Sequence, residues 1–118
     1  MAVKKQRAIS YRQVLGLVVR RRREALGLTQ RDLAGKLGME ASAWSRVETG
    51  RNGIELLVAR RLARALNTSL PELFHEADEV QKRLARTLPA GTRVLPSDAS
   101  KAELKSVALV GGAVLAGL

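Results

Sequence analysis

The chain has 118 residues, a formal net charge of +10, 46% hydrophobic but only 3% aromatic residues, and no cysteine. This length provides for one compact domain with short extensions. The absence of cysteine excludes a disulfide framework, a thiolate zinc site and a cysteine nucleophile. Because the core must be built mainly from Leu, Val and Ala, which favour helices, we expect an all-α fold.

The positive charge is concentrated in the N-terminal part. Residues 1–75 contain 15 Lys and Arg against 6 Asp and Glu, whereas residues 76–118 contain 6 against 5. Such a field suits a polyanion, either nucleic acid or an anionic membrane; the alternative is a charged face that only adds solubility. Residues 1–10 are expected to form a basic N-terminal arm. No apolar run of secretory length follows them, so we expect a cytoplasmic protein.

Two predicted helices come first. In residues 11–26 (YRQVLGLVVRRRREAL), apolar side chains recur three and four positions apart until Gly27 ends the helix. Thr29 and Asp32 have the spacing of a capping box, which begins a second helix over QRDLAGKL. Gly38 ends this helix after about two turns.

Three further helices are predicted before residue 76. The third runs from Ala41 to Thr49, and the fourth, IELLVARRLARAL, carries one apolar stripe and ends at Asn67. Ser69 with Glu72, and Pro71 in the first turn, begin the fifth. Its apolar positions continue until LPAGTRVLPSDAS breaks the pattern, so residues 78–100 are expected to be a helix extension and linker.

Residues 101–118 are predicted to be an apolar C-terminal helix. Ser100 and Glu103 supply its cap, and it ends as VALVGGAVLAGL. As a helix this run would span about 18 Å, too short for a bilayer core of about 30 Å. Its small residues four apart favour dimer contact; docking onto the chain's own core and weak membrane association through Val107 to Leu118 remain open.

The segment LTQRDLAGKLGMEASAWSRVETG, Leu28 to Gly50, has the organisation of a helix-turn-helix unit. Two short helices flank a turn with Gly38, where a positive φ carries no Cβ penalty. Ala34 allows the two helices to approach. Trp44 is interpreted as a core anchor rather than a residue that stacks on DNA.

Over Leu15 to Phe74 the chain resembles the Cro/CI-like (XRE-type) helix-turn-helix regulators. The matching features, in order, are LGLVVRRRREALGLTQ, Leu33-Ala34, Leu37-Gly38, SRVETG, LARAL and SLPELF. The resemblance implies a five-helix, lambda-repressor-like DNA-binding domain over residues 11–77. The sequence pattern after it adds a C-terminal arm and an apolar tail.

The resemblance also implies which residues contact DNA. The base-contacting positions are Ala41, Ser42 and Arg46. The phosphate-contacting positions are Gln30, Arg20, Arg31, Ser45 and Arg51. Arg46 is the strongest candidate reader, because a guanidinium can contact O6 and N7 of guanine together. Gln30 lies at a helix N-terminus, whose dipole favours phosphate.

Two of the positions that depart from the family pattern lie at the start of the third predicted helix. Ala41 stands where a long polar reader is common, and Glu40 replaces the usual Ser or Thr N-cap. Either thymine-methyl contact and DNA shape contribute to recognition, or the groove fit differs from the family norm. The resemblance further implies a structural ion pair between Arg23 and Glu48, which links the first helix to the end of the third.

No catalytic chemistry is predicted. His75 is the only histidine, without a ligand set at metal spacing, and the acidic residues that follow it lack a partner nucleophile. We expect no enzyme activity, cofactor or metal. The favoured function is a transcriptional regulator that binds a palindromic operator in double-stranded DNA as a homodimer. The alternatives are an antitoxin whose arm after Leu88 covers a toxin, and a membrane-associated interaction protein that has lost DNA binding.

Overall fold

The computed structural model describes residues 7–95 and 99–109. Its helices are α1 (Tyr11–Ala25), α2 (Gln30–Leu37), α3 (Ala41–Glu48), α4 (Leu56–Ala65), α5 (Leu70–Thr87) and α6 (Lys101–Lys105). Its strands are β1 (Arg7–Ile9), β2 (Arg93–Val94) and β3 (Ala108–Leu109). Helices lie at each of the five positions predicted between residues 11 and 75.

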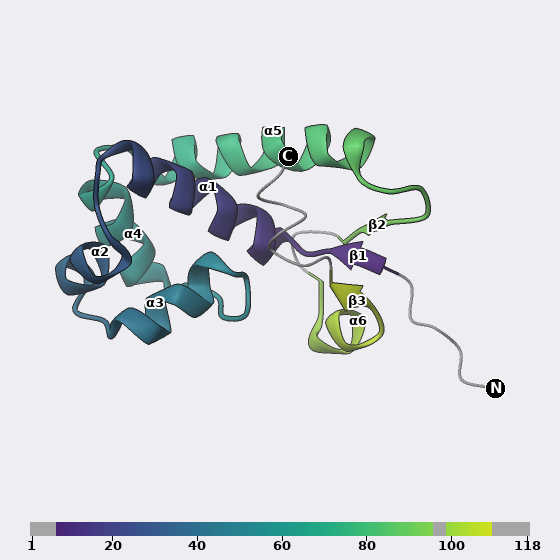
Figure 1. The fold of residues 1–118 in the computed structure, drawn as a ribbon, viewed down its shortest axis with the longest axis horizontal. Helices are drawn as coiled ribbons and strands as arrows, with labels where there is room; N and C mark the ends of the chain where they lie inside the picture. Colours follow the sequence, from purple (N-terminus) through teal and green to yellow (C-terminus); the bar gives the residue numbers. More distant parts are fainter. Residues whose placement is uncertain (1–6, 96–98, 110–118) are drawn as a thin grey trace.

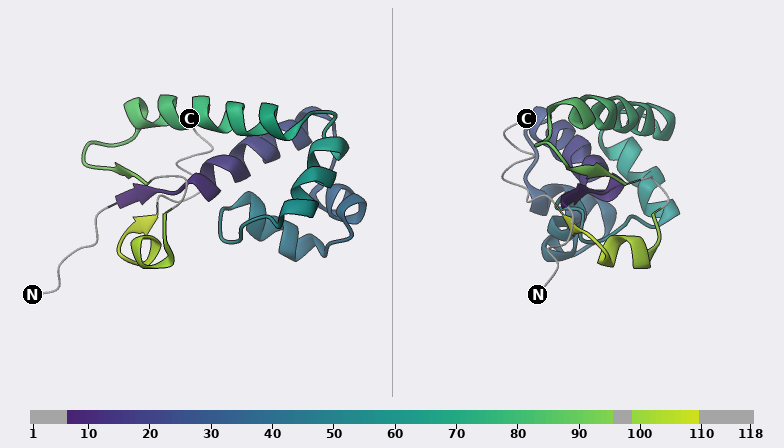
Figure 2. Two further views of the ribbon diagram at one scale, coloured as in Figure 1. Left: turned by 180° about the vertical axis from the view of Figure 1, so that it is seen from behind. Right: turned by 90° about the vertical axis from the view of Figure 1, so that its right-hand side faces the viewer.

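The first helix, α1, lies at the centre of the domain, with α5 on one side and α3 on the other (Figures 1 and 2). It is buried on both sides through Val14, Val18 and Val19. Its start is set by a capping box, in which Ser10 Oγ accepts from the Gln13 backbone and Gln13 Oε1 accepts from the Ser10 backbone. The Ser-x-x-Gln spacing of this box is a helix-start signal that local sequence contains.

The helix-turn-helix turn has the predicted chemistry. Thr29 Oγ1 accepts from the Asp32 backbone at 3.0 Å, and Asp32 Oδ2 accepts from the Thr29 backbone at 2.9 Å. Gly38 ends α2 with φ 67°, in the left-handed region that favours glycine. Ala34 is buried beneath the turn, so α2 and α3 pack closely.

A second glycine fixes the approach of α1 to α3. A Cβ atom at Gly16 would collide with the backbone carbonyl oxygens of Val47 and Glu48. Only glycine therefore allows the end of α3 to lie against the middle of α1. A glycine inside an otherwise regular helical pattern indicates such a close approach.

The later helices begin where side chains cap them. Glu55 accepts hydrogen bonds from the backbone of Leu57 and Val58, so α4 starts at Leu56. The fifth helix continues without a break past residue 77, and Val80 and Leu84 are buried in the same core as the preceding helices. The predicted helix extension is therefore part of the domain.

The expectation of an all-α fold is wrong in one respect. The three strands form a parallel sheet in the order β2-β1-β3, at the end of the molecule opposite α2 and α4 (Figure 1). Ile9 joins the helical core, while Ala8 packs with Leu95 and Val107 in a second cluster. Residues 7–9 are thus a central strand and not part of a basic arm.

The prediction of one helix over residues 101–118 is also wrong. The helix α6 ends at Lys105, and Ala108–Leu109 pairs with β1 as a strand. None of the residues of α6 is buried, whereas Val107 is buried in the small cluster beside β1. Because burial is gained by pairing with β1, the chain forms a strand here and does not continue as a helix. The rest of the predicted tail, residues 110–118, lies outside the described residues. Within the described ranges, no helix is long and apolar enough to cross a membrane.

Candidate nucleic-acid interface

The helix α3 has two chemically different faces. Trp44, Val47 and Glu48 are buried. At 100° per residue, Ser42 and Arg46 lie on the opposite side of the helix, and both are exposed. Ala41 and Ser45 are half-buried at its margins. Of the three predicted base-contacting positions, Ser42 and Arg46 therefore lie on the exposed side of α3, and Ala41 lies at its margin next to the buried side. We call Ala41, Ser42, Ser45 and Arg46 the outer face of α3.

The buried face of α3 is held by the carboxylate of Glu48. Arg23 donates to it through Nε at 2.7 Å and through Nη2 at 3.0 Å. Gln30 Nε2 donates at 3.0 Å, and Trp44 Nε1 donates at 2.5 Å. The Glu48 side chain is only 1% exposed, so these donors replace the water that a carboxylate would otherwise need.

Arg23 connects this carboxylate to the rest of the domain. Its Nη1 donates to the Leu28 carbonyl at 2.7 Å, in the connection between α1 and α2. Hydrogen bonding to Glu48 raises the pKa of Arg23. The ion pair predicted between these two residues is thus present, and it fixes α3 relative to α1.

Gln30 has a role that the sequence did not indicate. It is the first residue of α2, and its side-chain amide donates a partly buried hydrogen bond to Glu48 Oε1. A phosphate contact at this position would come from the backbone N–H groups of the first turn, which have no partners within a helix. The predicted assignment of Gln30 to phosphate remains a prediction.

The predicted phosphate-contacting arginines differ in their surroundings. Arg31 and Arg51 are exposed. Arg20 is also exposed, but its Nε lies 2.7 Å from Glu24 Oε1. The loop that carries Arg51 is tied to α3, because the backbone N–H of Arg51 donates to the Arg46 carbonyl at 2.9 Å. This hydrogen bond holds the backbone of Arg51 next to the C-terminal end of α3.

Glu40 is the N-cap residue of α3, as predicted, but its side chain makes no capping hydrogen bond. It is exposed. The Glu40 carboxylate, which does not cap the helix, places a negative charge at the start of α3, next to the outer face that carries Arg46.

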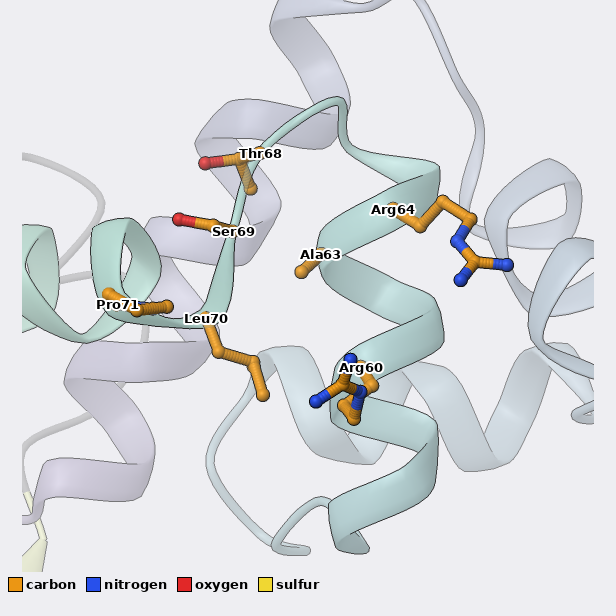
Figure 3. Close-up of a pocket in the computed structure, with 7 residues that line it drawn as sticks. All are labelled: Arg60, Ala63, Arg64, Thr68, Ser69, Leu70 and Pro71. Atoms are coloured by element: carbon orange, nitrogen blue, oxygen red, sulfur yellow. The ribbon is translucent and has the colours of Figure 1, made fainter.

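A pocket of about 350 Å³ between α4 and the start of α5 has no catalytic arrangement. Figure 3 shows that Arg64 extends to the opposite side of α4 from Thr68 and Ser69. Both hydroxyls serve α5: Thr68 donates to Glu72 Oε2, and Ser69 accepts from the Glu72 backbone. Among the residues that the structure describes, no group of His, Cys, Asp and Glu could hold a metal ion.

Comparisons with known proteins agree on the helical region. The family model described as "Helix-turn-helix domain" matches residues 14–76. An "uncharacterized HTH-type transcriptional regulator" of Methanothermobacter thermautotrophicus is 41% identical over 62 residues, which cover 52% of this chain and 90% of that protein.

Two solved structures are similar in fold. The clp gene regulator ClgR from Corynebacterium glutamicum has a TM-score of 0.56 and 28% identity, over 58% of this chain and 88% of its own. The restriction-modification controller protein C.AhdI from Aeromonas hydrophila has a TM-score of 0.51 and 35% identity, over 53% of this chain and 96% of its own. The chain therefore belongs to the helix-turn-helix domain family, as a DNA-binding regulator of the Cro/CI-like (XRE) type.

Proposed function

We propose that this chain is a sequence-specific transcriptional regulator that inserts the outer face of α3 into the major groove of operator DNA. The observation that carries the proposal is the two-sided character of α3. Its inner face is anchored through Glu48, and its outer face presents Arg46 and Ser42 to solvent. A rigidly supported polar helix face is what direct readout of base edges needs. We expect it to act in the cytoplasm.

Within this interface we assign sequence reading mainly to Arg46. Its side chain is long enough for a bidentate contact with guanine, whereas Ser42 discriminates weakly and Ala41 offers only its methyl group to thymine. The phosphate contacts are assigned to Arg31, Arg51, Arg20, Ser45 and the N-terminus of α2 at Gln30. These contacts position the protein and carry no sequence information.

We further propose that the protein binds a palindromic operator as a homodimer. Helix-turn-helix dimers place their recognition helices about 34 Å apart, one turn of DNA. The proposed dimer contact is the apolar tail from Val107 to Leu118. Val107 is buried beside Ala8, so the contact is proposed for the residues that follow it. Of these, Ala108 and Leu109 form an edge strand, and Leu109 is 42% exposed.

The experiment that tests the function is selection of bound fragments from a genomic library by the purified full chain. The proposal expects one enriched sequence with two-fold symmetry. The same selection with Arg46→Ala should lose the enrichment, and Arg61→Ala, a change at an exposed position on α4, should retain it. Recovery of fragments without a common sequence by the parent chain would contradict sequence-specific binding.

The antitoxin hypothesis needs the arm after Leu88 to cover a toxin. In the structure, Leu95 and Val107 of that arm pack on Ala8 instead. Neither the antitoxin function nor membrane association has an observation in its favour among the described residues.

A further inference from the structure

Four consecutive arginines, Arg20 to Arg23, lie in the last turns of α1, and one of them differs from the rest. Three have carboxylate partners: Arg20 with Glu24 at 2.7 Å, Arg22 with Glu76 at 2.6 Å, and Arg23 with Glu48 at 2.7 Å. Arg21 is exposed and forms no ion pair with any residue that the structure describes. The proposed DNA interface does not use it.

Arg21 lines a pocket together with two arginines from another helix. The pocket has a volume of about 280 Å³ and is bounded by Arg21 of α1 and by Arg83 and Arg86 of α5. Val80 and Leu84, both buried, form its apolar side. Like Arg21, the two α5 arginines are exposed and have no ion-pair partner within residues 7–95 and 99–109.

This combination indicates an anionic ligand. Three guanidinium groups at one pocket repel one another, and each leaves its planar set of donors available for phosphate or carboxylate oxygens. The adjacent apolar side can accept a hydrocarbon group at the same time, as small-molecule sites do. Glu24 and Glu79 lie near enough to Arg21 and Arg83 to interact with them electrostatically, but among the described residues no carboxylate lies within ion-pair distance of the three guanidinium groups.

The pocket is separate from the proposed DNA interface. It lies along α5, and α1 separates α5 from α3 (Figures 1 and 2). A ligand bound here would touch α1, the helix to which Arg23 ties the recognition helix. An anion at this place can therefore affect α3 without competing for its outer face.

We propose that this pocket binds a small organic phosphate, with the phosphate group held by Arg21, Arg83 and Arg86 and the apolar group against Val80 and Leu84. The proposal is independent of DNA binding. A test uses the full chain and two probes, hexyl phosphate and inorganic phosphate. Calorimetry gives the dissociation constants, and amide chemical shifts locate the bound probe.

Hexyl phosphate should bind about tenfold more tightly than inorganic phosphate, because only the former covers the apolar side. The double variant Arg83→Gln/Arg86→Gln should weaken hexyl phosphate binding by about tenfold or more. The matched double variant Arg61→Gln/Arg64→Gln removes two exposed charges from α4 and should change it less than about twofold. The amide chemical-shift changes caused by hexyl phosphate should be confined to α1 and the second half of α5.

Two results would overturn the proposal. One is equal binding of hexyl phosphate by the two double variants, which would mean that only overall charge attracts the probe. The other is absence of hexyl phosphate binding together with weaker duplex DNA binding by Arg83→Gln/Arg86→Gln alone, which would assign these arginines to DNA phosphates. Neither result affects the assignment of α3 to base reading.

Discussion

Arg23 Nε lies 2.7 Å from Glu48 Oε2, and this contact joins the end of α1 to the end of α3 across 25 positions of sequence. Their side chains are 9% and 1% exposed. Because Trp44 and Gln30 donate to the same carboxylate, loss of Glu48 leaves three polar partners without their acceptor. The position of α3 therefore depends on this buried ion pair.

Replacing Glu48 by Ala should lower the free energy of unfolding by about 3 to 5 kcal/mol, because the buried Arg23 keeps only the more distant, exposed carboxylate of Glu24, at 3.8 Å. Urea denaturation measures this loss. Glu24→Ala is the control, because its side chain is 52% exposed and surface ion pairs contribute about 0 to 1 kcal/mol. Equal stability of Glu48→Ala and the parent chain would refute the structural role of the pair.

Two glycines in helices should respond in opposite directions to alanine. Gly16→Ala should destabilise the domain by about 1 to 3 kcal/mol, since its Cβ would meet the carbonyl oxygens of Val47 and Glu48. Gly35→Ala should stabilise α2 by about 0.5 to 1 kcal/mol, because among the described residues no atom beyond the adjoining residues and backbone of α2 lies within 4 Å of the added Cβ. Thermal unfolding of both variants is the measurement, and a Gly16→Ala midpoint at or above that of the parent contradicts the close approach.

The helices and their caps follow from local sequence. Thr29 with Asp32 and the glycine at Gly38 act over three or four residues, so the sequence contains the whole signal. The interior contacts of Gly16 and Gln30 could not be predicted in this way. They depend on which segment of α3 lies opposite, which is a property of tertiary packing.

The sheet could not be predicted from the sequence either, because its signal is also not local. Its strands have three, two and two residues, too few to display the alternation that identifies a strand. They also pair across most of the chain, with Ala8 opposite Arg93 on one side and Leu109 on the other. The outer face of α3, by contrast, can be proposed from the sequence. The family resemblance indicates its positions, and the interpretation of Trp44 as a core residue fixes which side of the helix faces inward.

Stability at alkaline pH should depend on Tyr11. Burial, and then the Asp78 carboxylate, raise the pKa of Tyr11 from 10.0 to about 12 in the folded chain. A raised pKa means that the folded state favours the protonated phenol. The contribution of Tyr11 to the free energy of unfolding is complete below pH 10 and is lost as the pH rises from about 10 to about 12.

Urea denaturation of the parent chain and Tyr11→Phe across this pH range isolates the effect from lysine titration, which both share. The parent should lose more stability than the variant between pH 10 and 12. Parallel curves would show that Tyr11 does not couple to folding in this range.

Deletion of residues 110–118 tests the proposed dimer contact while leaving Val107 in its buried place beside Ala8. The thermal midpoint of the domain should stay unchanged, and self-association measured by sedimentation should weaken. Binding to a two-half-site operator should weaken with it, through lost avidity. An unchanged dimerisation constant would exclude the tail as the dimer contact.

Loss of a proposed phosphate-contacting arginine should affect DNA binding differently from loss of Arg46, the proposed base reader. Arg31→Ala and Arg51→Ala should each weaken binding to preferred and random DNA alike, and should lower the slope of log affinity against log salt by about one. Titrations at several salt concentrations measure the slope. If either change weakened only the preferred site, that arginine would belong among the base-contacting residues.

The most direct test of the account is the affinity of Arg46→Ala for the selected operator and for a random duplex of equal length, at one salt concentration. If the outer face of α3 reads DNA through Arg46, the variant should lose about 1 to 3 kcal/mol on the operator and little on the random duplex. Equal losses on both DNAs, or no loss on either, would contradict the assignment of Arg46 as the sequence reader.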